Sequence, residues 1–113
     1  MYKRRARLAF ASSSPALAER AARIALARGA DWVEACSCPA GAVPSACDLL
    51  VTLDRAALEA CPHLPPGCRH AHWPLSTSPT DADIGSRVDG LVGGMRLLAR
   101  LDGSEAPGGT RRA

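Results

Sequence analysis

Apolar and polar residues alternate along the chain in short blocks that predict strands and helices in turn. Residues 6–12 form a short apolar run between charged residues and serines, which is typical of a buried strand. Residues 48–53 are almost continuously apolar and predict a central strand that is buried on both faces. Residues 31–36 and 68–74 predict two further strands, and the last of these carries His70 and His72 on one face.

Three helices are expected beside these strands. Residues 14–28 predict the first, because Ser14 can cap it, Pro15 suits its first position and Gly29 can end it. Asp54 can cap a short second helix over residues 55–60. Apolar or partly apolar side chains recur at helical spacing in the first and the last helix. They are Leu17, Ala21, Ile24 and Arg28 in the first, and Ile84, Val88, Leu91, Val92, Met95 and Leu98 in the last.

The order strand, helix, strand, strand, helix, strand, helix predicts an α/β fold. We expect three α/β/α layers around a four-stranded parallel sheet. The loops lie at 37–47 and in the polar stretch 76–83. Ligands of such sheets bind at the carboxyl ends of the strands. This edge is expected to carry residues 12–14, the turn at Asp54 and residues 76–78. One domain should cover residues 1–103, followed by a flexible tail at 104–113.

Composition and charge narrow the classes of partner. The 113 residues carry a net charge of +3, and the positive charge gathers at the two ends of the chain. We interpret the basic start as a solvated terminus rather than a nucleic-acid site, because no aromatic stacking stripe accompanies it. No apolar run approaches the roughly 18 residues that a membrane span needs, and no export signal is recognisable. The expected location is cytoplasmic, with no contact with nucleic acid or membrane.

Cysteine and histidine supply the main candidate chemistry between residues 36 and 72. In the cytoplasm the five cysteines should be mostly thiols, and Cys36, Cys38 and Cys61 are candidates for thiol or redox chemistry. The stretch 61–72 spaces its cysteines and histidines as C-x-H-x4-C-x-H-x-H, which fits no standard zinc site. We therefore assign no metal and no cofactor, although a small metal- or metalloid-binding protein remains an alternative.

Ser12, Ser13 and Ser14 stand between the first strand and the first helix. Backbone N–H groups and hydroxyls at a helix start can hold a phosphate-like anion. Ordinary capping is the competing explanation, but it needs one serine rather than three. These serines are therefore the candidate anion site.

Three stretches carry a resemblance to a known family. They are SPALAERAARIALARG at 14–29, CDLLVTLDRAALEACP at 47–62 and PPGCRHAHWPLSTSP at 65–79. Their sequence and order resemble the low-molecular-weight protein-tyrosine phosphatases and the thiol-dependent arsenate reductases, over about residues 6–101. The resemblance implies a phosphatase-like α/β scaffold and an oxyanion as the ligand.

The catalytic residues that the resemblance implies are missing. The family's Cys-x5-Arg loop follows the first strand, whereas here no cysteine precedes Cys36 and Arg20 lies on the helix. Ser12 falls near the nucleophile's position, but a serine hydroxyl needs an adjacent base, and none is visible locally. Ser78-Pro79 replaces the family's Asp-Pro, whose aspartate protonates the leaving group. Asp81 and Asp83 lie nearby, and a displaced general acid at one of them is the alternative. Of the reductases' redox cysteines, only Cys61 has a match.

The sequence therefore predicts a degenerate relative of this family with no catalytic residues. Its expected role is binding, either of a weak phosphate-like anion or of a protein partner, which includes a second copy of the chain. Two alternatives stay open. One is a divergent phosphatase or thiol-dependent reductase with rearranged catalytic residues, and the other is the metal- or metalloid-binding protein.

Overall fold

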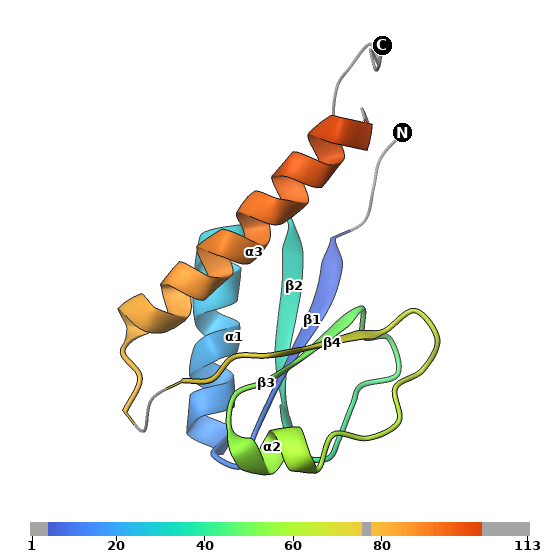
Figure 1. The fold of residues 1–113 in the computed structure, drawn as a ribbon. Coiled ribbons are helices and arrows are strands. Elements are labelled where there is room, and N and C mark those ends of the chain that lie inside the picture. The colour runs from blue at the N-terminus through green and yellow to red at the C-terminus, as the bar shows by residue number, and fades with distance from the viewer. Residues whose placement is uncertain (1–4, 76–77, 103–113) are drawn as a thin grey trace.

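The computed structural model describes residues 5–75 and 78–102, and all four expected strands and three helices are present in the expected order. The elements are β1 (Ala6–Ser12), α1 (Pro15–Gly29), β2 (Val33–Pro39), β3 (Leu49–Thr52), α2 (Arg55–Glu59), β4 (Arg69–His72) and α3 (Asp81–Asp102) (Figure 1). The expected tail at 104–113, the first four residues and residues 76 and 77 of the polar loop lie outside the described residues.

The four strands form one parallel sheet in the order β2-β1-β3-β4, as the sequence predicts. β1 lies between its two partners: Ala11 stands opposite Cys38 on β2 and opposite Thr52 on β3. The chain moves outward from β1 to β2 and then returns to the other side of β1 to form β3. The carboxyl ends of β1 and β3 therefore flank the point where the strand order reverses, which is the usual place for a ligand in an open α/β sheet.

Helices cover both faces of the sheet, but unequally. α1 and α3 pack on one face, where their apolar residues join Leu8, Phe10 and Val51 in the main core. The opposite face carries Ala9, Ala11 and Leu50 and is covered by the five-residue helix α2 and by residues of the loops 40–47 and 61–68. The predicted α/β fold is confirmed, with a thin third layer.

The core follows from the alternation of side chains along the two central strands. On β1, Leu8 and Phe10 point to one face and Ala9 and Ala11 to the other. Phe10 is fully buried, and its ring centroid lies 5.5 Å from that of Trp73, with the rings tilted by 55°. Trp73 thus packs in the core, and its contact with Phe10 joins the end of β4 to the centre of the sheet.

The buried face of α1 consists of small residues. Ser14 caps the helix, as expected, by accepting a hydrogen bond from the Leu17 N–H at 3.4 Å. The buried side chains are Ala18, Ala21, Ala22 and Ala25, so the stripe predicted through Arg28 is only partly correct. Arg28 is exposed and pairs with Asp89 of α3 through two hydrogen bonds, of 2.9 and 2.7 Å. Alanines let the helix lie close to the sheet.

β2 is shifted relative to the prediction. The sequence predicts a strand over 31–36 and a loop from residue 37, but the strand runs from Val33 to Pro39. The extra pairs join Phe10 to Ser37, Ala11 to Cys38 and Ser12 to Pro39. β1 runs to Ser12 and offers a partner for each of these residues, and a proline is tolerated at the end of an edge strand.

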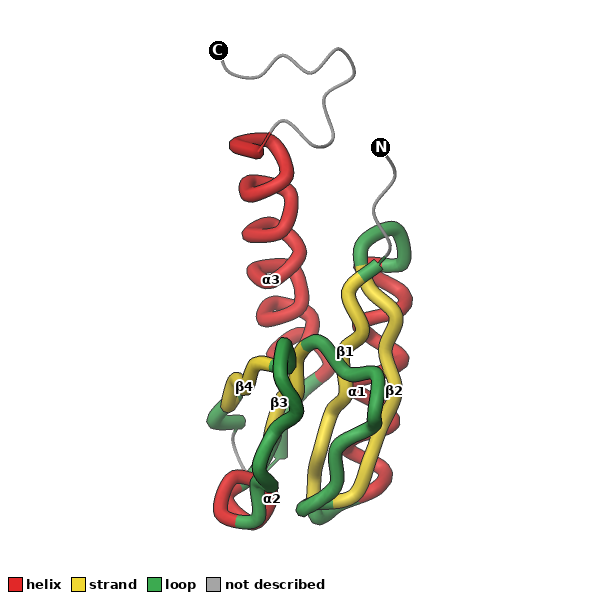
Figure 2. Tube along the Cα trace, turned by 90° about the vertical axis from the view of Figure 1, so that its right-hand side faces the viewer, coloured by secondary structure: helices red, strands yellow, loops and turns green. Residues whose placement is uncertain are grey.

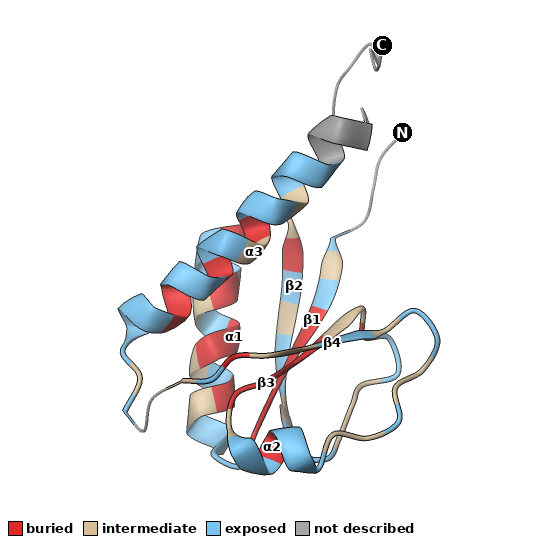
Figure 3. Cartoon of the chain, viewed as in Figure 1, coloured by how far each residue is buried: buried red, intermediate tan, exposed pale blue. Residues whose placement is uncertain are grey.

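α3 extends beyond the end of the sheet (Figure 2). Ile84, Val88 and Val92 are buried at the predicted spacing. Leu91 and Met95 of the predicted stripe are partly buried against the same core. Leu98 is 62% exposed and Leu97 is 52% exposed, so the predicted apolar stripe does not stay buried as far as Leu98. Figure 3 shows that buried residues of α3 lie in its first part. The apolar spacing continues along α3, but the sheet and α1 do not extend far enough to cover this part of the helix. None of the helices within the described residues is long and apolar enough to cross a membrane.

Two glycine substitutions test how α1 meets α3. A Cβ added at Gly29 would lie 2.8 Å from Cγ2 of Val92, whereas a Cβ at Gly93 of α3 would meet nothing within 4 Å. We expect Gly29→Ala to lower the free energy of unfolding by about 1–3 kcal/mol through overpacking. Gly93→Ala should raise it by about 0.5–1 kcal/mol through helix propensity. Urea unfolding of both variants measures the difference, and equal effects would contradict the close approach of the two helices.

Candidate functional site

The candidate anion site lies where the strand order reverses. Ser12 is the last residue of β1, and Asp54 follows β3, its neighbour in the sheet. The Leu53 N–H donates to the Ala11 carbonyl at 3.0 Å, which continues the pairing of the two strands up to this edge. The structure therefore brings residues 12–14 and Asp54 together, although 42 residues separate Ser12 from Asp54.

The Asp54 carboxylate accepts the hydrogen bonds that the serine turn, residues 12–14, can donate at this edge. Its Oδ2 accepts three hydrogen bonds, from the Ser12 hydroxyl at 2.7 Å, the Ser13 N–H at 2.9 Å and the Ser13 hydroxyl at 2.9 Å. Its Oδ1 accepts a fourth, from the Ala57 N–H at 2.8 Å, which caps α2. The anion that contacts this turn in the structure is thus the protein's own carboxylate.

The three serines have different roles. The Ser12 side chain is buried, donates to Asp54 and accepts a hydrogen bond from the Ser14 N–H at 2.9 Å. Ser13 is exposed and gives both its backbone and its side-chain donor to Asp54. Ser14 directs its hydroxyl to the first turn of α1. Capping accounts for one serine, and the internal carboxylate accounts for the other two.

The hydrogen bonds keep Asp54 ionised. Partial burial of the carboxyl raises its pKa, but the bonds from Ala57, Ser12 and Ser13 lower the pKa by more, so it lies below that of an ordinary aspartate. A carboxylate with a lowered pKa is a weak base. It therefore holds the Ser12 proton in a hydrogen bond without removing it.

The basic and acidic residues considered as substitutes for the missing catalytic groups are paired elsewhere. Arg20 donates from Nε to Oδ1 of Asp81 at 2.6 Å and from its guanidinium to the Pro79 carbonyl. Asp83 and Thr80 form a reciprocal cap at the start of α3, with bonds of 3.0 and 3.1 Å, and hydrogen bonding from Thr80 lowers the pKa of Asp83. Arg20 and Asp81 thus fasten the loop before α3 onto α1.

His70 and His72 share one face of β4, as the sequence predicts, and both rings meet Thr52. The Thr52 Oγ1 lies 3.0 Å from Nε2 of His70 and 2.8 Å from Nδ1 of His72. Thr52 is fully buried, and its hydroxyl can donate to one ring and accept from the other. The common partner of both rings is therefore a threonine on the neighbouring strand β3.

Two of the three candidate thiols, those of Cys36 and Cys38, are not activated as nucleophiles. Cys36 and Cys38 lie two residues apart on β2, and burial raises the pKa of both thiols. The Cys38 thiol donates to the Ala42 carbonyl at 3.5 Å, and the Cys61 thiol follows α2 and faces the Pro62 carbonyl at 3.7 Å. Within residues 5–75 and 78–102, no three side chains among His, Cys, Asp and Glu are grouped so that they could hold a metal ion.

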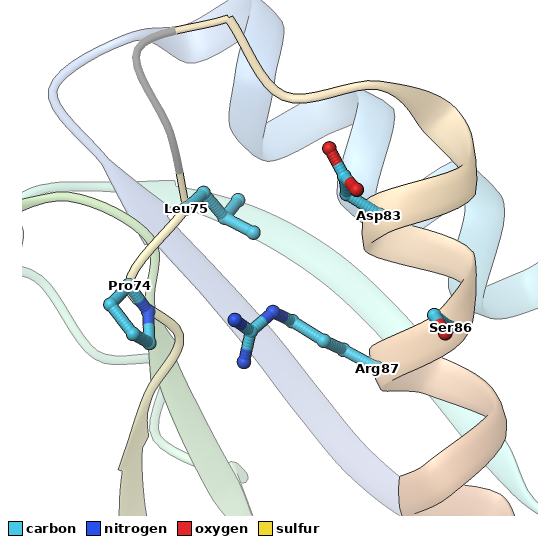
Figure 4. Close-up of a pocket in the computed structure, with 5 residues that line it drawn as sticks. All are labelled: Pro74, Leu75, Asp83, Ser86 and Arg87. Carbon is cyan, nitrogen blue, oxygen red and sulfur yellow. The ribbon is translucent and has the colours of Figure 1, made fainter.

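A separate open pocket of about 450 Å³ lies between α3 and the segment that follows β4. Asp83, Ser86 and Arg87 of α3 line one side, and Pro74 and Leu75 line the other, with the Arg87 side chain directed across the opening (Figure 4). No motif in the sequence indicates this pocket. The spacing of residues 83, 86 and 87 places them on one helix face, but only the tertiary structure shows what stands opposite.

Comparison of the chain with protein-family models and with curated proteins gave no match. The resemblance to the phosphatases and arsenate reductases therefore depends on the three stretches quoted above.

The state of Asp54 predicts a pH dependence of stability. Because the pKa of Asp54 is lower in the folded chain, its contribution is present above the ordinary aspartate pKa of about 4 and is lost as the pH falls through the folded value. At pH 7, Asp54→Ala should reduce the free energy of unfolding by about 1–3 kcal/mol, from the lost cap and serine bonds. The difference between the two proteins should shrink below pH 4 in urea unfolding. A difference that stays constant from pH 7 to pH 3 would contradict an ionised, hydrogen-bonded Asp54.

Proposed function

We propose that this chain is a shortened, non-catalytic relative of the low-molecular-weight protein-tyrosine phosphatases and arsenate reductases, and that it acts by binding. The observation that carries the proposal is the Asp54 carboxylate in the serine turn. The four-stranded parallel sheet, with this turn at its point of reversal, supports such a scaffold.

Covalent chemistry at this edge lacks both a nucleophile and a base. Ser12 donates its proton to a carboxylate whose lowered pKa makes it a weak base. Cys38 is the cysteine nearest to the turn along the paired strands, since it stands opposite Ala11. Its thiol donates to Ala42, and burial raises its pKa, so it remains protonated near neutral pH.

The serine turn retains the donors of an anion site, but they are already in use. A phosphate-like ion has to displace Asp54, which means breaking three hydrogen bonds and overcoming the repulsion of a carboxylate. We therefore propose that Ser12, Ser13 and Ser14 bind such an anion weakly, and that competition from the Asp54 carboxylate lowers their affinity for it.

An assay with an aryl phosphate ester, together with a phosphate titration followed by NMR, tests this function. We expect no turnover by the wild-type chain and phosphate binding that is weaker than millimolar. Asp54→Ser keeps a capping hydroxyl for α2 while it removes the competing charge, and it should bind phosphate at least tenfold more tightly, by about 1.4 kcal/mol. Glu59→Gln on α2 removes the same charge outside the turn and is the control that should change nothing.

Two outcomes would contradict the proposal. Turnover by the wild-type chain that is abolished by Ser12→Ala or Cys61→Ser would show that it is an enzyme with rearranged chemistry. Phosphate binding by the wild type that equals binding by Asp54→Ser would show that Asp54 does not occupy the anion position.

A specific observation also favours protein–protein binding. Leu97 and Leu98 are adjacent, more than half exposed, and lie on the part of α3 that extends past the sheet. Contact with another chain would remove these two side chains from water. We propose that this part of α3 pairs with the same part of a second copy, since a twofold axis places like residues against each other.

Sedimentation across a range of protein concentrations tests this pairing. The wild type should show a concentration-dependent dimer, and the double variant Leu97→Glu, Leu98→Glu should weaken dimerisation at least tenfold by placing charges in the contact. Leu58→Glu on α2 is the matched control, because Leu58 is also an exposed leucine, at 38%, but lies on another face. A wild-type chain that stays monomeric at every concentration would exclude the second copy as the partner.

A further inference from the structure

All five cysteines gather on the side of the sheet that α2 and the two loops cover. Cys47 is buried in the second apolar cluster, and Cys38, Cys61 and Cys68 pack against that cluster. Cys36 lines a pocket of about 260 Å³ together with Cys47. The five thiols come from β2, from the loop before β3 and from the segments that flank the turn before β4. The sequence gives no sign that these segments converge.

Within this group, Cys47 and Cys68 lie beside each other. The Cys68 thiol lies close enough to Cys47 to raise the pKa of the Cys47 thiol, and both are free cysteines. Cys47 directly precedes Asp48 and Cys68 directly precedes Arg69, and the Arg69 N–H donates to the Asp48 carbonyl at 2.9 Å.

This backbone bond holds the two chain segments at the distance of neighbouring strands, right beside both cysteines. The parallel register continues from there, with Leu49 opposite Arg69. Neighbouring strands lie about 4.8 Å apart, which places residues one position out of register within the Cα separation of roughly 4.4–6.8 Å that a disulfide requires. The two sulfurs can therefore be bonded without separating β3 from β4.

We propose that Cys47 and Cys68 form a reversible intrachain disulfide when the reduced protein meets a small disulfide oxidant such as oxidised glutathione. Cys68 is partly exposed, and it reacts first: its sulfur, as the thiolate, attacks one sulfur of the oxidant, and the first glutathione leaves and takes up a proton. The Cys47 sulfur then attacks the Cys68 sulfur of the mixed disulfide, and the second glutathione leaves with the proton that Cys47 gives up. Two protein thiols are oxidised and one glutathione disulfide is reduced to two thiols.

The surroundings of Cys47 suit the role of the second, resolving thiol. Burial and the nearby Cys68 thiol raise the pKa of Cys47 to about 12, so this thiol is unreactive until a mixed disulfide is formed next to it. It remains reachable, because it lines the open pocket beside Arg7 and Pro44. Cys36, which is exposed on β2, lines the same pocket.

The disulfide would change the segment that carries the candidate site. It closes a loop from residue 47 to residue 68, and this loop contains β3, Asp54 and α2. A covalent closure limits the conformations that the unfolded loop can adopt and so favours the folded form. Oxidation on one face would thus stabilise the element that supplies the carboxylate at the carboxyl edge.

Equilibration of the full-length chain in glutathione buffers, from fully reduced to fully oxidised, tests the proposal. After alkylation of the remaining thiols, intact mass should change from five labelled cysteines to three without a glutathione adduct. Fragmentation of the linked peptides should place the bond between Cys47 and Cys68. The thermal midpoint should rise by roughly 5 °C or more on oxidation and return with a reductant.

Four variants make the assignment specific. Cys47→Ser and Cys68→Ser should each lose the disulfide, and Cys47→Ser should instead collect a glutathione adduct at Cys68. Cys36→Ser and Cys61→Ser are matched controls that should keep it. Wild-type protein that retains five thiols in oxidised buffer, that carries only glutathione adducts, or that links a different pair overturns the proposal, and none of these readings depends on the variants folding.

Discussion

The Asp54 carboxylate holds together the part of the structure where the strand order reverses. Its two oxygens accept hydrogen bonds from the end of β1 and from the start of α2, so one side chain joins two elements that are far apart along the chain. Each bond to a charged acceptor contributes more than a neutral one, and each donor left without a partner would cost free energy at a partly buried edge. The serine turn and the short helix therefore depend on the same group.

The same principle, a charged side chain that joins distant segments, recurs on the helical face. Arg28 joins the end of α1 to Asp89 of α3, and Arg20 joins the middle of α1 to the loop before α3. These contacts lie at the surface, where ion pairs add little to stability by themselves. Their effect is to orient α3 over small apolar residues, whose close packing supplies most of the stabilisation.

The candidate anion site and the cysteines lie in different places on the sheet. Oxygen and charge gather at the carboxyl edge, around Asp54, whereas sulfur gathers on the face covered by α2 and the loops. The loop from residue 47 to residue 68 connects them, because it begins and ends at cysteines of that face and carries Asp54 in its middle. The proposed binding role is consistent with this arrangement, since the Asp54 carboxylate is ionised and hydrogen-bonded and burial raises the pKa of the Cys38 thiol.

The sequence by itself determined the elements and their order. Apolar runs bounded by turn residues fixed β1 and β3, and the caps at Ser14 and Asp54 fixed where two helices begin, because these signals depend only on neighbouring residues. The tertiary structure decided what depends on distant partners: the extension of β2 to Pro39, the exposure of Leu98 and the direction of the Asp54 carboxylate. The local sequence shows the alternation typical of a strand at β2, but it does not show how far the partner strand β1 extends. It shows that Asp54 can cap α2, but it does not show that the same carboxylate binds the serines at the end of β1.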